Sequence, residues 1–251
     1  MHIDIVTLFP EMIAPYFASS IMAKAVDNGI ITYDIINFRD YAYDNHKTCD
    51  DIPYGGGAGM VIKCEPIGRA LDELDARHKK VIFPTPSGKQ FTQNAATKLS
   101  LEEHLVFICG HYEGLDQRII EEYEAEEYSI GDYVLTSGEI SSIVMIDAIF
   151  RLIDGVITKE SLIDESFSNE LLEYPQYTRP EGYCKKNVPR VLLSGNHKKI
   201  ATWRDLRSIQ KTMQNRPDLL STASLDVERR KLLINVIDDK GNDQNGHDQS
   251  Y

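Results

Sequence analysis

The sequence LVFICGHYEG at residues 105–114 gives the clearest indication of the fold class. Its first five residues form a continuous apolar run, which predicts a buried strand at residues 105–109. The strand leads directly into Gly110 and a short polar stretch, and a helix is predicted at residues 116–124. Open α/β sheets bind ligands outside the carboxyl ends of their strands. This stretch therefore predicts an α/β protein with a ligand site after residue 109.

The same alternation extends over residues 1–157. Strands are also predicted at 2–8, 31–37, 80–83 and near 128–130, with a turn at 85–88 and helices at 21–28, 65–77, 92–99 and 139–153. Strands that alternate with helices indicate a largely parallel sheet. The regular spacing of apolar residues is lost at 158–177 and returns as a helical pattern at 198–236. Residues 238–251 form a polar tail that is expected to be disordered.

Charge is distributed unevenly along the chain. The formal net charge of −12 argues, taken alone, against a nucleic-acid partner. Residues 1–178 hold 13 Lys/Arg and 30 Asp/Glu (−17), residues 179–237 hold 13 and 5 (+8), and residues 238–251 hold 1 and 4 (−3). A basic segment joined to an acidic body suggests a polyanion as the partner of the basic part.

The cysteines and the hydropathy pattern exclude several classes of protein. Cys49, Cys64, Cys109 and Cys184 form no CxxC pair, so zinc and other metals are not expected. Scattered thiols in a chain of this size favour a reducing, cytoplasmic compartment. The first ten residues have no basic region, which argues against a signal peptide, and no apolar run reaches the roughly 18 residues of a membrane span.

Two further glycine-containing segments are candidate ligand loops. Residues 54–60, YGGGAGM, lack the Gly-Lys-Ser/Thr of a phosphate-binding loop and the strand–helix context of a dinucleotide fingerprint. They also lack the arginine of sugar nucleotidyltransferase loops, and a flexible surface loop is the alternative. Residues 129–139, SIGDYVLTSGE, are predicted to enter a helix, with Thr136 or Ser137 as its cap. They form either a ligand wall or a capped turn.

Taken together, the motifs resemble one family. GGGAGM at 55–60, GHYEG at 110–114 and SIGDYVLT at 129–136 are followed by YTRP at 177–180 and LSGNH at 193–197. Their order and spacing are similar to those of the bacterial tRNA (guanine-N1)-methyltransferases, which methylate guanosine 37 beside the anticodon. The resemblance covers about residues 1–220.

The resemblance implies the architecture and the partners. Residues 1–157 would form a SPOUT-type catalytic domain, an α/β domain with a parallel sheet whose chain threads a deep trefoil knot, an exception to the rule of unknotted chains. Residues 158–177 would be a linker with an active-site loop, and residues 178–237 a small all-helical tRNA-binding domain. A homodimer would complete each active site, and neither DNA nor a membrane is expected as a partner.

The resemblance also implies S-adenosylmethionine as methyl donor, while a divalent ion such as Mg²⁺ stays open. The donor would lie among backbone groups of three loops, at 83–88, 110–114 and 130–138. The residues expected to bind it are Phe83, Pro84, Thr85, Pro86, Gly88, Gly110, Tyr112, Glu113, Gly114, Ile130, Gly131, Asp132, Tyr133, Val134, Leu135, Ser137 and Gly138.

For catalysis, the family places an aspartate as general base directly before Ser-Phe. Here Glu165 precedes Ser166-Phe167, and Asp164 is the alternative. The two residue types have similar reference pKa values, about 4.3 and 3.9, so the exchange preserves the chemistry. Arg151 matches the family's catalytic arginine, which would stabilise charge on guanine O6. It alternatively pairs with Asp147 on its own helix.

Two positions depart from the family pattern. Ser137 and Glu170 stand where glycine is usual. A positive φ at Ser137 would cost roughly 1–2 kcal/mol, and Glu170 would change the order of the linker.

Candidate contacts to the RNA come from residues 54–60, which we call the glycine-rich loop, and from the basic segment at residues 179–237. Phosphate contacts would position the RNA rather than read its sequence, and Trp203 is expected to lie in a core. The proposed set is Tyr54, Gly55, Gly56, Gly57, Gly59, Met60, Lys185, Arg190, His197, Lys198 and Arg204. Two alternatives are a related enzyme acting on another RNA base and a catalytically inactive RNA-binding relative.

Overall fold

The computed structural model describes residues 1–158, 165–167 and 170–245, with side chains up to residue 238. The chain forms two compact units, Met1–Thr158 and Lys159–Tyr251. Each unit is described by itself below. Asp164, the alternative base in the sequence analysis, lies outside the described residues.

The first unit contains a five-stranded sheet. Its strands are β1 (His2–Thr7), β2 (Thr32–Asn37), β5 (Lys80–Gln90), β6 (His104–Ile108) and β7 (Glu126–Ser129). They lie in the order β2-β1-β6-β5-β7, and every neighbouring pair is parallel. The predicted α/β class with a parallel sheet is confirmed.

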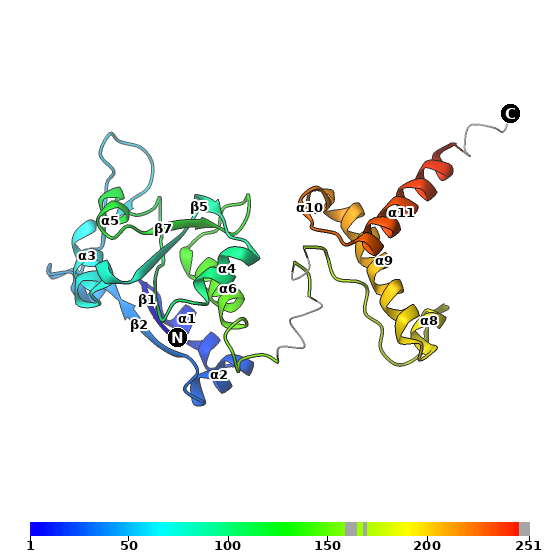
Figure 1. The fold of residues 1–251 in the computed structure, drawn as a ribbon. Coiled ribbons are helices and arrows are strands. Elements are labelled where there is room, and N and C mark those ends of the chain that lie inside the picture. The colour runs from blue at the N-terminus through cyan, green and yellow to red at the C-terminus, as the bar shows by residue number, and fades with distance from the viewer. Residues whose placement is uncertain (159–164, 168–169, 246–251) are drawn as a thin grey trace. The chain divides into compact units, whose positions relative to one another are not determined.

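Helices cover both faces of this sheet, as Figure 1 shows. On one face, Ile3 and Ile5 pack into a core that also holds Phe17 and Ile149. On the other, Val6 packs with residues such as Ile67. The first face is covered by α1 (Pro10–Phe17), α2 (Ser20–Asp27), α4 (Gln93–Leu99) and α6 (Gly138–Phe150). The second is covered by η1 (Phe38–Tyr41), α3 (Cys64–Glu73), η2 (Ala76–His78) and α5 (Gln117–Glu122).

Strand β5 differs from its prediction. The strand runs to Gln90, beyond its predicted end at residue 83, and residues 85–88, predicted to be a turn, form an irregularity within it: Pro84 and Lys89 both pair with Tyr128 of β7. A Cβ atom at Gly88 would lie 2.5 Å from the amide nitrogen of Tyr128. Glycine therefore allows two backbones to approach closely here, in the manner of a strand glycine beside a bulge.

A small antiparallel pair, β3 (Asp50–Asp51) with β4 (Val61–Ile62), closes the base of the glycine-rich loop. Within the loop, Gly55, Gly56 and Gly57 have positive φ, and the Tyr54 side chain is fully exposed. Glycine is needed at these three positions because positive φ is costly for other residues.

The second unit contains both helices and strands. Among its described residues, the helices are α8 (Arg190–Leu193), α9 (His197–Asn215), α10 (Pro217–Thr222) and α11 (Val227–Asn245). They are preceded by an antiparallel hairpin of β8 (Gly182–Tyr183) with β9 (Lys186–Asn187). The expectation of an all-helical segment at 178–237 is therefore wrong in this part. Cys184 and Lys185, with φ of 50° and 62°, form a tight turn of the kind that suits two-residue hairpins.

The core of the second unit joins residues that are far apart in the sequence. Leu171, Ile209 and Leu225 form its buried centre, with Leu232 and Leu233 packed against them. Two hydrogen bonds attach the backbone of Leu172 to α9: its N–H donates to Thr212 Oγ1 at 2.9 Å, and its carbonyl accepts from Ser208 Oγ at 2.5 Å. Residues 171–172, predicted to lie in a linker, thus belong to this core.

Helix α11 is longer than predicted. It continues to Asn245, whereas a disordered tail was expected from residue 238. Apolar residues of its amino-terminal half anchor it, including Val236, which is buried, and helix propagation past such an anchor is easier than nucleation. None of the helices in the described ranges combines the length and the apolar character required to cross a membrane.

Candidate functional site

A cavity of about 220 Å³ lies at the carboxyl ends of β6 and β7. We call it the first cavity. It is far larger than the ~10–15 Å³ that one water molecule needs, so it can hold a small organic molecule. Its wall is formed by residues 83–86, 110–114, 128–131 and 133–138, together with Ser141. A ligand site at this edge of the sheet is what the fold favours.

The first cavity brings together the three loops that the sequence analysis singled out. All residues predicted to bind the methyl donor line it, except Gly88 and Asp132. Gly88 instead lies against the backbone of β7, and Asp132 is exposed on the loop after β7.

Five further residues line the cavity that the donor set omitted: His111, Tyr128, Ser129, Thr136 and Ser141. Ser141 lies four residues after Ser137 along α6, so helical spacing could have identified it. His111, Ser129 and Thr136 are immediate neighbours of residues that the set already held, and Tyr128 lies two residues before Ile130.

Two glycines hold the loops against each other. The N–H of Gly138 donates to the carbonyl of Gly110 at 2.7 Å. A Cβ atom at Gly138 would lie 2.6 Å from the Gly110 nitrogen, and one at Gly110 would lie 2.9 Å from Phe83 Cε2. Any side chain at Gly138 would therefore push the start of α6 away from the loop after β6.

Ser137 is compatible with this arrangement. Its φ of −161° is extended, so serine carries no left-handed strain at a position where the family usually has glycine. Its Oγ atom is buried without a partner among the described residues, and so is Nδ1 of His111, the residue that bridges to Ser137. Buried polar atoms are rarely left unpaired in folded proteins. These two atoms therefore suit a bound molecule that offers hydrogen-bonding groups.

The charge of the wall also restricts the ligand. Among the described residues, Glu113 is the one charged side chain in the lining, which holds neither lysine nor arginine. Such a wall suits a neutral or cationic molecule and does not suit phosphate groups. Next to Glu113, Tyr112 has a φ of 57°, a strained value that is common at functional sites. Its ring stacks on His111 at 4.6 Å between centroids.

A buried polar contact joins the end of β1 to the first turn of α6, next to Gly138 of the cavity wall. Thr7 Oγ1, at the end of β1, donates to Glu139 Oε1 in the first turn of α6 at 2.6 Å, and both residues are fully buried. Burial, with the nearby Glu139 carboxylate, raises the pKa of the Cys109 thiol. This cysteine therefore stays neutral and packs as an apolar residue.

The glycine-rich loop borders the first cavity. The N–H of Glu113 donates to the carbonyl of Met60 at 3.0 Å, and that of Ile62 donates to the carbonyl of Gly114 at 2.9 Å. A Cβ atom at Gly59 would collide with the Glu113 carboxyl group. The structure thus places the end of the loop beside Glu113, although no sequence signal links these segments.

The predicted RNA-binding residues of the second unit fall in two groups. His197 and Arg204 line a second cavity together with Glu165, the predicted base, and the Arg204 guanidinium lies 4.8 Å from the ring centroid of Tyr174. Lys185, Arg190 and Lys198 lie on the hairpin turn, at the start of α8 and in the first turn of α9. The cation Arg229 also lines this second cavity and was not predicted.

Two of the three predicted catalytic residues are described, one in each unit. Arg151 follows α6 in the first unit, and Glu165 lies in the second unit. Asp147, the alternative partner of Arg151, accepts a hydrogen bond from Tyr16 at 2.8 Å. Trp203 is half-buried on α9, with its ring 6.2 Å from that of Tyr177.

Comparisons with known proteins agree on one family. A family model described as tRNA (Guanine-1)-methyltransferase TrmD matches residues 1–222. Two relatives, each named tRNA (guanine-N(1)-)-methyltransferase, come from Treponema denticola and Treponema pallidum. The first is 57% identical over 223 residues, 89% of this chain and 92% of the relative. The second is 58% identical over 223 residues, 89% of each chain.

A relative of the same name from Borrelia duttonii is 55% identical over 221 residues, which cover 87% of this chain and 92% of the relative. Identity of this level over nearly the full length, together with the family model, leaves no other assignment. The chain belongs to the tRNA (guanine-1)-methyltransferase family.

Proposed function

We propose that the protein transfers a methyl group from S-adenosylmethionine to N1 of guanosine 37 in tRNA. The observation that carries this proposal is the first cavity, with its glycine-rich wall, its single carboxylate and its two unpartnered polar atoms. The family assignment supports the substrate and the reaction.

The residues of the first cavity fit such a donor. S-adenosylmethionine supplies a methyl group that its sulfonium charge already makes electrophilic. Backbone groups of residues 110–114 and 130–138 would hold it, while Ser137 Oγ and His111 Nδ1 would gain hydrogen-bond partners. Glu113 would attract the positive charge. Alignment of the two reactants is the main contribution left to the protein, and it can lower a barrier by several kcal/mol.

The acceptor guanine, unlike the methyl donor, must be activated by the protein. Guanine N1 carries a proton and is a poor nucleophile until that proton is removed. We assign this removal to the Glu165 carboxylate, with Asp164 as the alternative, and such general-base catalysis typically contributes about 10²–10⁴-fold. Arg151 would stabilise the negative charge that develops on guanine O6.

The basic segment would hold the RNA. Lys185, Arg190, Lys198 and Arg204 are assigned to phosphate contacts and His197 to stacking or packing, supported by the net charge of +8 over residues 179–237. On the catalytic side, residues 54–60 border the first cavity through Met60 and are assigned to the bound nucleotide.

For the architecture, we propose a SPOUT-type domain at 1–157, a linker with the base at 158–177 and a tRNA-binding domain at 178–237. The family assignment supports the trefoil knot within this domain. We also propose that two copies form a dimer whose interface completes each site, and that a divalent ion such as Mg²⁺ assists.

The decisive experiment is methyl transfer from labelled S-adenosylmethionine to two tRNA transcripts that differ only in guanine or adenine at position 37. We expect label in the first transcript alone, and 1-methylguanosine in its nucleoside digest. Label in both transcripts, or another modified base, would assign the protein to a different RNA target. Binding of tRNA without any transfer would identify an inactive relative.

A further inference from the structure

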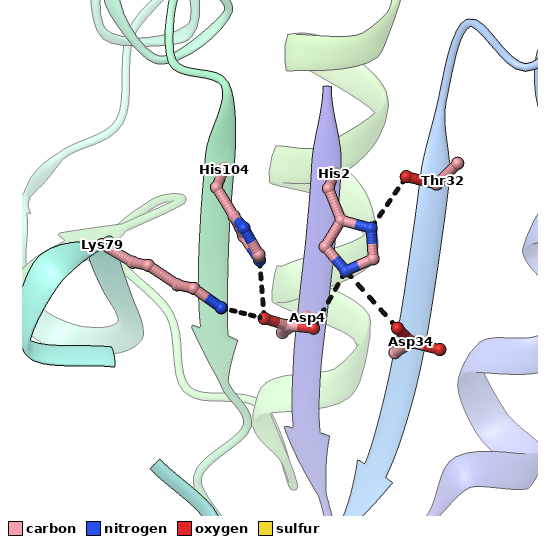
Figure 2. Close-up of polar contacts among 6 residues, drawn as sticks. All are labelled: His2, Asp4, Thr32, Asp34, Lys79 and His104. Atoms are coloured by element: carbon pink, nitrogen blue, oxygen red, sulfur yellow. Dashed lines mark hydrogen bonds and ion pairs between the residues drawn. The ribbon is translucent and has the colours of Figure 1, made fainter. Parts of the chain in front are cut away.

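A cluster of polar side chains lies at the amino ends of β1 and β6, at the edge of the sheet opposite the first cavity. His2 and Asp4 are two residues apart on β1, so both side chains point to the same face. In the parallel register, His2 is paired with His104, the first residue of β6. The sheet therefore brings two imidazoles and one carboxylate together from positions 102 residues apart, as Figure 2 shows.

Both imidazoles present the same nitrogen to Asp4. His104 Nε2 lies 2.6 Å from Asp4 Oδ2, and His2 Nε2 lies 3.1 Å from Asp4 Oδ1. The ligand atoms of the three residues lie within 4.8 Å of one another. Two imidazole nitrogens and a carboxylate are the donor set of some three-ligand zinc sites.

Burial and outer contacts favour a metal ion at this point. The Asp4 side chain is only 2% exposed, whereas those of His2 and His104 are 28% and 30% exposed. An ion can therefore enter from solvent and retain water on its outer side. The second nitrogen of His2, Nδ1, lies 2.7 Å from Thr32 Oγ1. Metal-bound histidines are usually fixed in this way by a partner on the other ring nitrogen.

Two charged neighbours complete the cluster. Lys79 Nζ lies 3.2 Å from Asp4 Oδ2 and occupies the cationic position beside the carboxylate. The exposed carboxylate of Asp34 lies 3.5 Å from His2 Nε2 and adds negative charge at the rim. A divalent ion would replace the ammonium group of Lys79, whose long side chain can turn toward solvent.

We propose that His2, Asp4 and His104 form a binding site for Zn²⁺ that is separate from the catalytic centre. Two of the three ligands are imidazoles, which excludes Mg²⁺ and Ca²⁺, the ions that prefer oxygen. His104 and Gly110 are six residues apart in nearly extended chain, which is roughly 20 Å, so the ion would lie far from the first cavity. Because its ligands come from β1 and β6, the ion would link the amino ends of these two strands, and its binding would be coupled to folding.

The test uses the untagged full-length protein, freed of metal and titrated with Zn²⁺ against a chromophoric chelator. We expect one zinc per chain, a higher unfolding temperature with zinc, and a visible absorption band when Co²⁺ replaces it. The variant His104→Gln should weaken zinc binding at least about tenfold, since loss of even an outer partner costs about 10–100-fold. His78→Gln, which alters a histidine that is 79% exposed and outside the cluster, serves as the matched control.

Two variants that preserve the ligands keep the test valid if His104→Gln does not fold. Thr32→Val should weaken zinc binding about 10–100-fold by removing the partner of His2 Nδ1. Lys79→Met should strengthen it, because it removes the competing cation. Equal zinc binding by the wild type and His104→Gln, or no zinc binding at all, would overturn the proposal and leave a buried carboxylate with three donors. A loss of affinity in Lys79→Met would do the same.

Discussion

The first cavity is walled largely by backbone, glycine and uncharged side chains, whereas Glu165, Arg204, Asp205 and Arg229 face the second cavity. A wall of the first kind recognises its ligand by shape and is sensitive to every added atom. A wall of the second kind acts through charge and responds to neutralisation and to salt. The two units of this chain must therefore be probed with different substitutions.

The largest effect is expected from a charge change in the second unit. Glu165→Gln should lower the rate of methyl transfer by about 10²–10⁴-fold, because it removes the proposed base, and should leave S-adenosylhomocysteine binding unchanged. Single-turnover kinetics and calorimetry measure the two quantities. Glu173→Gln is the matched control, since Glu173 lines the same cavity and its carboxylate accepts a hydrogen bond from Gln176. If Asp164→Asn alone abolished transfer, the base would be Asp164.

A change of shape in the first unit should come next. Gly138→Ala places a methyl group against the Gly110 nitrogen. Overpacking of this kind costs about 1–3 kcal/mol, and we expect S-adenosylhomocysteine affinity to fall roughly 10–100-fold in calorimetry. In Gly68→Ala the added atom meets Ile119 Cδ1 at an ordinary 3.5 Å, so that variant should bind normally. Equal affinity in both variants would show that the loop contact does not shape the cavity.

Added salt should affect the binding properties of the two regions differently, with a smaller effect than the two substitutions above. The affinity for tRNA should fall steeply between low and high salt, whereas the affinity for S-adenosylhomocysteine should hardly change. Lys198→Ala should reduce the slope of log K against log [salt] by about 1, as expected for one lost phosphate contact. Fluorescence anisotropy with labelled tRNA measures the slope. A wild-type tRNA affinity that is independent of salt would contradict the charge-based role of the second unit.

The smallest effect concerns Glu170, whose φ of 60° is left-handed. Its Oε2 atom accepts a hydrogen bond from the N–H of Ser224. Glu170→Ala keeps the strained backbone and loses the bond, whereas Glu170→Gly loses the bond but relieves roughly 1–2 kcal/mol of strain. The glycine variant should therefore be more stable toward urea than the alanine variant. Trp203, the single tryptophan, reports unfolding of this unit by fluorescence. Equal stability of the two variants would rule out strain at this position.

The elements that could be predicted are those with a strong local signal. The strand before Gly110 is a buried apolar run, and the loops that line the first cavity contain the motifs of the family. Contacts between distant segments had no such signal. The approach of Gly59 to Glu113, the packing of Leu171 on Ile209 and the meeting of His2 with His104 depend on strand order and register, which local patterns do not encode. The turn at Cys184 and Lys185 was missed because it contains no glycine or asparagine.

The pairing of His2 with His104 also governs how the chain is made. Strand β1 emerges early from the ribosome and can pair with β2, but its other edge must wait for β6, 102 residues after His2. At about 5–20 residues per second, this wait lasts about 5–20 s. During that time an apolar strand has one row of hydrogen-bonding groups open to other chains. Nascent copies of this protein should therefore depend on chaperones that shield strand edges.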